Sequence, residues 1–319
     1  MTAIGELPER AMRSAILSLS RQARVGRLAT RLSLTRSMVQ RFVAGETLVE
    51  ALEALDRLRA AGRRTTVDVL GESVQSEAAA TAAADRYLEL LDALAGRGLD
   101  GNVSLKLSQM GLDLSPELCR ANVARVFEAA AATGAFVRID MEDHARTDST
   151  LAIWRELRAI NPASGVVIQA ALRRSADDVT ALIAERAPVR LCKGAYREPA
   201  AVAFPTKPEV DESYLTLLGR LLREGASPAL ATHDPRMIRA ATDLVEREGL
   251  GRDRFEFQML YGIRRDLQQQ LVGAGYRVRI YVPYGREWYP YFMRRLAERP
   301  ANVMFLLRSV VHEERRRPS

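Results

Sequence analysis

The stretch Phe136–Glu142 reads FVRIDME, a short apolar run that ends on charged residues. Seven more runs of this kind lie before and after it, at Thr65–Glu72, Asn102–Ser108, Gly165–Ala170, Val189–Ala195, Ala229–Asp234, Phe255–Gly262 and Val278–Gly285. Consecutive runs are separated by enough residues for one helix and two turns. Eight strands joined by crossover helices predict an α/β fold, the (βα)8 TIM-type barrel.

An open, doubly wound sheet is the alternative arrangement of the same elements. That fold requires a glycine-rich phosphate loop after an early strand, and neither Thr65–Glu72 nor Asn102–Ser108 is followed by one. The barrel is therefore favoured, and its active site should lie where the C-terminal strand ends converge. The polar or aromatic residues at those ends are Glu72, Lys106, Asp140, Gln169, Lys193, His233, Tyr261 and Tyr281.

Length and composition limit the class of protein. A chain of 319 residues suits one barrel with extra helices, and 47% hydrophobic with 27% charged residues is typical of a soluble globular protein. No apolar run approaches the roughly 18 to 20 residues of a membrane-spanning helix. The N-terminus lacks the pattern of a secretory signal. Cys119 and Cys192 lie far apart in the chain, so no disulfide framework is expected and a reducing cytoplasm is the predicted location.

The net charge of +7 would be compatible with nucleic-acid binding. All but three of the 47 basic residues are arginine, and they are spread over the helical segments instead of forming one stripe. We therefore expect no nucleic-acid partner. Two of the three lysines, Lys106 and Lys193, lie at predicted strand ends, where a compact point charge indicates a site too narrow for a guanidinium group.

Two segments fall outside the regular repeat. Residues 1–62 are expected to form an N-terminal helical arm or cap, because leucines such as Leu48, Leu52 and Leu55 recur at three- and four-residue spacing. Residues 63–319 are expected to form the barrel. Within it, Glu198–Glu209 contains three prolines and is predicted to be a loop.

The most specific segment is Val278–Asn302, which joins the eighth strand to a following helix. On that helix Tyr291, Arg294, Arg295 and Glu298 lie at i, i+3, i+4 and i+7, so they share one face. A surface helix would also carry arginines of this kind. Two guanidinium groups beside the last strand nevertheless suit a carboxylate, and we expect a small substrate that bears one.

The other charged residues at the predicted strand ends allow two interpretations. Lys106 could bind the substrate, or it could form a salt bridge with Asp140. As a buried carboxylate among basic groups, Asp140 is expected to be ionised and to hold a cation or orient a substrate amine. Arg190 and Lys193 differ in register, so one of the two could face outward, and periodicity does not say which.

The remaining polar residues give weaker signals. The small residues between Lys193 and Tyr196 would let backbone amides approach a flat or phosphorylated ligand. His233 after the sixth strand is more typical of a hydrogen-bonded structural residue than of a catalyst. With His144 and His312 far away and no HxH or HExxH spacing, no metal site is expected.

Six segments together resemble the proline dehydrogenase family: VSLKLSQMGLDL, RIDMEDHARTDSTL, RLCKGAYREP, ATHDPRMI, FQMLYG and RIYVPYG with YFMRRLAERPAN. They occur in the family's order, and the resemblance runs from about Thr65 to Arg308. It implies a distorted (βα)8 barrel that holds FAD and oxidises L-proline. It also implies a monofunctional enzyme, because the chain is too short to include an aldehyde dehydrogenase half.

The resemblance assigns roles by position in this sequence. It implies that Lys106, Arg294 and Arg295 clamp the substrate carboxylate, that Tyr281 and Leu260 pack on the proline ring, and that Tyr291 favours proline over hydroxyproline. Catalytic roles fall to Asp140, Arg190 and Tyr281. The implied FAD contacts are Met141, Gln169, Arg190, Lys193, Gly194, Ala195, Tyr196, Thr232, His233 and, with a pocket-side role as the alternative, Glu298. Neither Glu72 nor Tyr261 receives a role.

The implied reaction is hydride transfer from proline C5 to flavin N5, with Δ1-pyrroline-5-carboxylate as the product. The electrons would then pass to a membrane quinone, which fits a cytoplasmic protein that contacts the inner membrane surface transiently. The alternatives are the same flavin barrel acting on another cyclic or secondary amino acid, such as hydroxyproline, and a basic interaction protein that is not an enzyme. The oligomeric state is left open.

Overall fold

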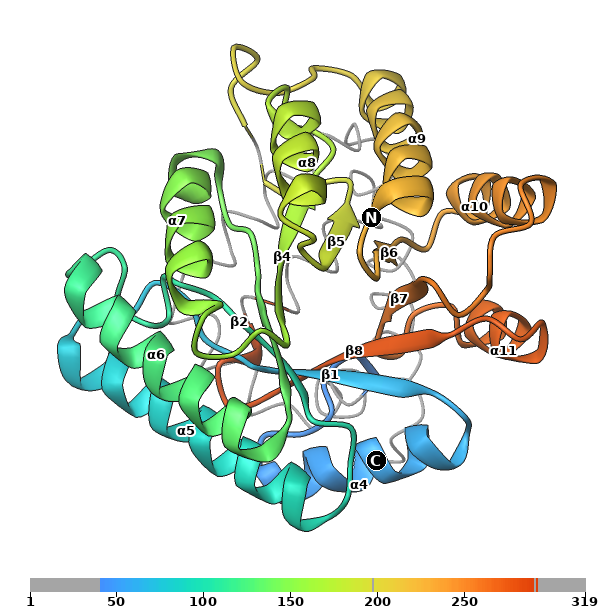
Figure 1. Cartoon of the computed structure of the whole chain (residues 1–319). Coiled ribbons are helices and arrows are strands. Elements are labelled where there is room, and N and C mark those ends of the chain that lie inside the picture. The colour runs from blue at the N-terminus through green and yellow to red at the C-terminus, as the bar shows by residue number, and fades with distance from the viewer. Residues whose placement is uncertain (1–40, 197, 290, 292–319) are drawn as a thin grey trace, which may run out of the picture.

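The computed structural model describes residues 41–196, 198–289 and 291. Within this part of the chain eight parallel strands close into a barrel in the order β1 to β8, and β8 pairs with β1 (Figure 1). The strands are β1 (Arg64–Val69), β2 (Asn102–Leu105), β3 (Phe136–Ile139), β4 (Ser164–Gln169), β5 (Val189–Cys192), β6 (Ala229–Ala231), β7 (Glu256–Leu260) and β8 (Val278–Tyr284). The predicted (βα)8 barrel is confirmed.

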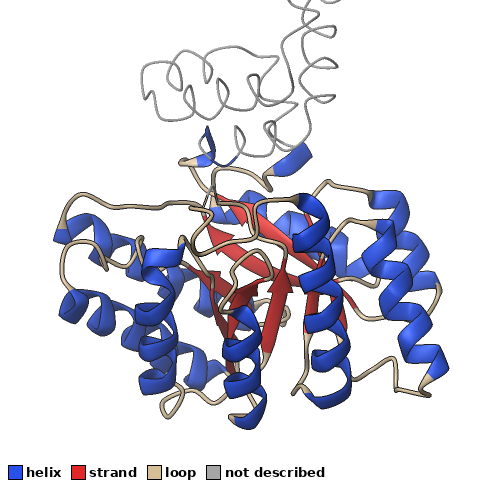
Figure 2. Ribbon diagram, turned by 90° about the horizontal axis from the view of Figure 1, so that it is seen from above, coloured by secondary structure: helices blue, strands red, loops and turns tan. Residues whose placement is uncertain are grey.

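Helices surround the strands on the outside (Figure 2). They are α4 (Leu48–Ala60), α5 (Glu77–Gly96), α6 (Pro116–Thr133), η1 (His144–Arg146), α7 (Thr147–Leu157), α8 (Ser175–Ala184), α9 (Lys207–Glu224), α10 (Pro235–Arg247) and α11 (Arg265–Gly273). Gly96, Gly98 and Gly101 have GxGxxG spacing. They lead from α5 into β2, so they do not form the strand-to-helix phosphate loop of a doubly wound sheet.

Helix α9 begins earlier than the sequence predicted. Thr206 and Glu209 form a capping box, in which each side chain accepts a backbone hydrogen bond of the other residue. Pro208 falls in the first turn, where a missing N–H group costs nothing. The helix therefore starts at Lys207, and the loop predicted for Glu198–Glu209 is wrong over its last residues.

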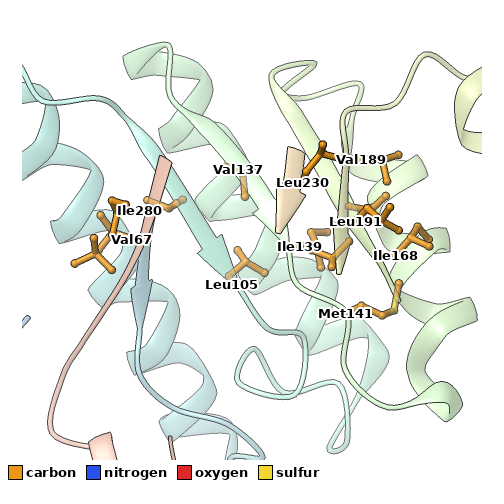
Figure 3. Packing of buried hydrophobic residues seen from close by; sticks show 14 of the residues in the cluster. Val67, Leu105, Val137, Ile139, Met141, Ile168, Val189, Leu191, Leu230 and Ile280 are labelled. Carbon is orange, nitrogen blue, oxygen red and sulfur yellow. The ribbon is translucent and has the colours of Figure 1, made fainter. Parts of the chain in front are cut away.

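Alternate positions of the strands form an apolar outer layer. Val67, Leu105, Val137 and Leu191 are each fully buried and belong to one hydrophobic cluster (Figure 3). The same cluster includes helical residues such as Trp154 of α7. Burial of this layer between the strands and the helices is the main favourable term that holds the barrel together.

Many of the remaining strand positions carry polar and charged side chains that point into the barrel, between smaller apolar residues such as Val167 and Ala229. Arg190 of β5 donates a hydrogen bond to Ser104 of β2 at 2.9 Å, and these strands are not neighbours, so the bond crosses the barrel. Toward the N-terminal ends of the strands, Arg279 donates to Glu256 at 2.8 Å. Barrels of this type are usually filled by layers of branched aliphatic residues. This interior instead contains a network of hydrogen bonds and ion pairs that crosses the barrel.

Side chains separate β1 from β2 after Asp68. The two strands pair in register only as far as Asp68 and Ser104. Beyond that point, the Tyr87 hydroxyl donates to the Ser104 carbonyl at 2.7 Å and accepts from the Val69 amide at 3.3 Å. Gln109 donates to the Val69 carbonyl at 2.8 Å. Both backbone groups of Val69 are therefore satisfied by side chains instead of by the sheet.

Each predicted run extends one to three residues past the end of the observed strand, and two of these runs are informative. Because side chains replace the ladder at Val69, β1 ends there, and Glu72 lies in the loop that follows. β8 continues to Tyr284, so Tyr281 lies within the strand and not at its end. Tyr281 still reaches the interior of the barrel, since its hydroxyl bonds to Asp140 after β3.

The described residues before α4 are attached to the end of β8. The Ala44 amide donates to the Pro283 carbonyl at 2.9 Å, and the Gly285 amide donates to the Gly45 carbonyl at 3.0 Å. α4 then packs on β1 and β8, with Leu55 fully buried. A helical arm over residues 1–62 remains a prediction, because residues 1–40 lie outside the described part. Among the residues described, no helix has the length and apolar character needed to span a membrane.

Candidate active site

Five side chains meet at the C-terminal mouth of the barrel. Lys106 Nζ lies 3.0 Å from Asp68 Oδ1, 3.1 Å from Asp68 Oδ2 and 3.9 Å from Asp140 Oδ2. Arg190 Nη1 donates to Asp140 Oδ1 at 2.5 Å, and the Tyr281 hydroxyl donates to Asp140 Oδ2 at 2.8 Å. Two cations and two carboxylates are thus held within one hydrogen-bonded cluster, the mouth cluster of Asp68, Lys106, Asp140, Arg190 and Tyr281.

Burial and charge set the protonation states in the mouth cluster. Burial would lower the pKa of Lys106, but the adjacent Asp68 and Asp140 outweigh it and raise the pKa, so the ammonium form is kept. Burial raises the pKa of Asp68, and Lys106 opposes that shift. Burial and then Asp140 raise the pKa of Tyr281 well above its ordinary value, so its hydroxyl stays protonated and can donate.

The sequence had left the partner of Lys106 and the direction of Arg190 open. Lys106 lies within 3.9 Å of Asp140, but its closer partner is Asp68. Arg190 is 5% exposed and points into the barrel. Lys193 lies just after β5, where it pairs with Asp211 at 2.5 Å and Asp234 at 2.7 Å. Arg190 and Lys193 therefore face the same end of the barrel, Arg190 inside it and Lys193 at its rim.

Hydrogen bonds join three loops around the mouth. The buried carboxylate of Glu142 accepts from the Ser108 amide at 2.9 Å and from the Ser108 hydroxyl at 2.5 Å. The Ser108 hydroxyl in turn accepts from the Ser73 amide at 3.1 Å. Gln169 donates to the Glu142 carbonyl at 2.8 Å. The loops after β1, β2 and β3 and the end of β4 are fixed relative to one another in this way.

The predicted cofactor contacts described by the structure lie along the same rim. Gly194 has φ of +110°, and a Cβ there would lie 3.1 Å from Ala171 and 3.3 Å from the Gln169 amide oxygen, so only glycine fits the turn without strain. His233 Nε2 accepts from the Leu260 amide at 2.9 Å, which requires that this nitrogen be unprotonated. Around these residues lie the buried Met141 and Thr232 and the exposed Ala195 and Tyr196.

The predicted substrate side is described only in part. Leu260 ends β7 and is half-buried, and Tyr291 is buried. Arg294, Arg295 and Glu298 lie outside the described residues, so their roles stay predictions. Tyr261, which received no role, is partly buried and packs against the hydrophobic core.

Sequence reasoning missed two buried residues: Asp68, which belongs to the mouth cluster, and Gln258, which bonds to it through Arg190. The alternation that placed Asp140 on the inner face of its strand also applies to TTVDVLGE and FEFQMLYG. In each run, however, the strand-end position selects the last polar or aromatic residue, Glu72 or Tyr261. The inward residues lie earlier in those strands.

Comparison with known proteins decides the family. The sequence profile of the proline dehydrogenase family matches residues 51–308. The chain is 41% identical over 304 residues to a proline dehydrogenase of Deinococcus radiodurans, with 94% of this chain and 97% of that protein covered.

The chain belongs to the proline dehydrogenase family.

Other relatives agree with this membership. Proline dehydrogenase 1 of Bacillus subtilis is 42% identical over 277 residues, which cover 87% of this chain and 92% of that protein. A solved structure of proline utilization A from Bdellovibrio bacteriovorus, inactivated by N-propargylglycine, superposes with a TM-score of 0.76 at 30% identity. That alignment covers 82% of this chain and 32% of the larger protein. The family and the enzyme class predicted from the sequence are confirmed.

Proposed function

We propose that this chain oxidises L-proline to Δ1-pyrroline-5-carboxylate with bound FAD as the acceptor. The observation that carries the proposal is the mouth cluster, which offers cations for a carboxylate and anions for an amine within one site. An α-amino acid carries both groups on one carbon atom. Membership of the proline dehydrogenase family supports the same substrate.

The residues along the rim fit a flavin dinucleotide. Lys193 and the turn at Gly194 provide a cation and an approachable backbone, as a pyrophosphate and a flat ring require. Bound FAD would supply the hydride acceptor, taking a hydride from proline C5 at its N5 atom. The residues proposed to hold it are Met141, Gln169, Arg190, Lys193, Gly194, Ala195, Tyr196, Thr232, His233 and Glu298.

The residues of the chain itself would bind and orient the substrate. Lys106 would hold the carboxylate together with Arg294 and Arg295, while Leu260, Tyr281 and Tyr291 would enclose the ring. Asp140 would orient the ring nitrogen, because it is a carboxylate fixed by two hydrogen bonds before the substrate arrives. Fixed groups of this kind lower the barrier, since little reorganisation is needed at the moment of reaction.

The fate of the electrons is part of the same proposal. A membrane quinone would reoxidise the reduced flavin, and the protein would act from the cytoplasm with transient contact at the inner membrane surface. The same barrel would oxidise another cyclic or secondary amino acid if its pocket bound a different ring. The deciding experiment therefore compares proline with such amino acids.

The experiment follows the flavin absorbance of the protein purified with FAD and mixed anaerobically with amino acids. We expect a yellow protein that L-proline bleaches faster than hydroxyproline or pipecolate. Lys106→Met should keep its flavin but need more proline for the same rate, because one partner of the carboxylate is lost. A colourless protein, or a flavin that proline leaves oxidised, contradicts the proposal. Faster bleaching by hydroxyproline or pipecolate would assign the alternative substrate.

A further inference from the structure

Three hydrogen bonds fix the guanidinium group of Arg190. Nη1 donates to Asp140 at 2.5 Å, Nη2 donates to the Ser104 hydroxyl at 2.9 Å, and Nε donates to Gln258 Oε1 at 2.5 Å. Arg190 and Gln258 are 5% and 3% exposed. The first bond belongs to the mouth cluster. The bond to Gln258 lies deeper in the barrel than the mouth cluster.

Only one orientation of the Gln258 amide satisfies both of its neighbours. Its oxygen must face Arg190, because a guanidinium group only donates hydrogen bonds. Its nitrogen must face Glu256, whose carboxylate only accepts, and Nε2 donates to Glu256 Oε1 at 2.6 Å. Glu256 is itself held by Arg279 Nε at 2.8 Å. The amide is therefore locked from both sides.

The position of Gln258 also keeps two ion pairs apart. Arg190 with Asp140 forms the upper pair, and Arg279 with Glu256 forms the lower pair. Glu256 lies two residues before Gln258 on the same face of β7, so it is the nearest competing anion along that strand. The neutral amide of Gln258 accepts a hydrogen bond from Arg190 of the upper pair and donates one to Glu256 of the lower pair. It therefore connects the two pairs and keeps Arg190 from pairing with Glu256.

We propose that Gln258 is a positioning residue that holds Arg190 against Asp140 at the mouth of the barrel. The inference rests on the proposed function, in which Arg190 is one of the residues that hold FAD. A cation at that position would also stabilise the reduced, anionic flavin. Gln258 acts only through Arg190. Without its amide, Arg190 Nε loses its partner and the guanidinium group turns toward Glu256.

The test compares Gln258→Met with a matched control, Asn161→Leu, in the FAD-loaded protein. Asn161 is 3% exposed and its amide also makes two hydrogen bonds, to the Ala135 carbonyl and from the Ala163 amide, both at 3.0 Å. Both variants therefore lose a buried amide with two bonds. We expect both to lower the melting temperature, because their former partners are left unsatisfied.

Only Gln258→Met should alter the chemistry. We expect its kcat to fall by about 10- to 100-fold, the size of effect that a small misplacement of a catalytic group produces. The KM for proline should change far less, since the carboxylate partners stay in place. The flavin midpoint potential, measured by dye equilibration, should fall, because the cation that stabilises the reduced flavin has moved away. Asn161→Leu should leave kcat and potential unchanged.

Gln258→Glu supplies a second readout that does not depend on the stability of the first variant. The introduced carboxyl can donate to Glu256 only while it is protonated, and then it reproduces both bonds of the amide. When it is ionised it still accepts from Arg190, but it is repelled by Glu256 and competes with Asp140 for the guanidinium group. Its deficit in kcat relative to the wild type should therefore shrink as the pH falls and grow as the pH rises. The wild type and Asn161→Leu should share one pH profile.

The outcomes separate the inference from the proposed function. If the wild type binds no FAD or is not reduced by proline, the proposed function fails. If the wild type is active, but Gln258→Met matches Asn161→Leu in kcat and potential, the positioning role is wrong. A deficit in Gln258→Glu that does not vary with pH would also contradict it. Should Gln258→Met not fold, the pH profile of Gln258→Glu decides.

Discussion

The pair of Asp68 and Lys106 should be strongly coupled, and a double-mutant cycle with Asp68→Asn and Lys106→Met tests this. The shorter of the two contacts is 3.0 Å, and Asp68 is 1% exposed. At an effective dielectric constant of about 20, opposite charges at this distance attract by ~5.5 kcal/mol, and the cost of burying both charges offsets part of this attraction. Breaking a buried pair from one side usually costs about 3–5 kcal/mol.

We therefore expect each single variant to lower the free energy of unfolding by about 3 kcal/mol, because each leaves one buried charge without its main partner. The double variant should lose about 3 kcal/mol as well, since no unpaired charge remains, and the coupling energy should be ~3 kcal/mol. Urea unfolding followed by tryptophan fluorescence and circular dichroism measures all four proteins. Additive losses, with a coupling energy below about 0.5 kcal/mol, would refute the reasoning.

The pH dependence of one arm gives an independent check. In Lys106→Met, burial still raises the pKa of Asp68 and the lysine no longer opposes the shift. An acid whose pKa is raised by folding contributes stability that is present below its unfolded pKa and lost as the pH rises through the folded value. The deficit of Lys106→Met should thus be smaller near about pH 5 than near about pH 8. An equal deficit at both values would be inconsistent with a buried, unpaired Asp68.

Three further predictions concern stability. Tyr87→Phe removes the hydroxyl that pairs with backbone groups of β1 and β2, and urea titration should show a loss of ~2 kcal/mol. Gly165→Ala would place a Cβ 2.2 Å from a backbone oxygen, so its melting temperature should fall by the equivalent of about 3 kcal/mol, whereas Gly96→Ala meets no atom within 4 Å and should not destabilise. Burial would raise the pKa of Asp211, but hydrogen bonds from lysines, Lys193 first, hold it below its usual value. The stability that the ionised Asp211 contributes is present above its unfolded pKa of about 4 and is lost as the pH falls through the lower, folded pKa. Asp211→Asn should therefore flatten the acid side of a plot of melting temperature against pH.

The barrel could be predicted from the sequence because its outer layer is regular. Val137 and Ile139 alternate with Arg138 and Asp140, and the same spacing recurs in the other strands. A period of two residues reports which side of a strand is buried in the apolar layer. It does not report where the ladder stops, and β1 stops early because side chains from α5 and from the loop after β2 bond to Val69.

The site was predictable residue by residue, but its pairings were not. Asp140 and Lys106 could be assigned to the mouth because each follows an apolar run. The partners of Lys193 come from α9 and from the loop after β6, and no local pattern relates such distant segments. Asp68 was missed for a different reason: the alternation of its run places it on the inner face, but it lies before the end of the run, and its partner Lys106 is 38 residues away.

The closure of the barrel by β1 and β8 has a consequence for synthesis. These strands pair along six residues, from Arg64 with Arg279 to Val69 with Tyr284, and the Arg279 side chain bonds to the Thr65 carbonyl 214 residues away. At ribosomal rates of about 5–20 residues per second, β1 waits roughly 10 to 40 s for its partner. During that time one edge of the growing sheet is open to other chains. Cooperative folding of this barrel is therefore expected to be a late event, completed only when the last strand has left the ribosome.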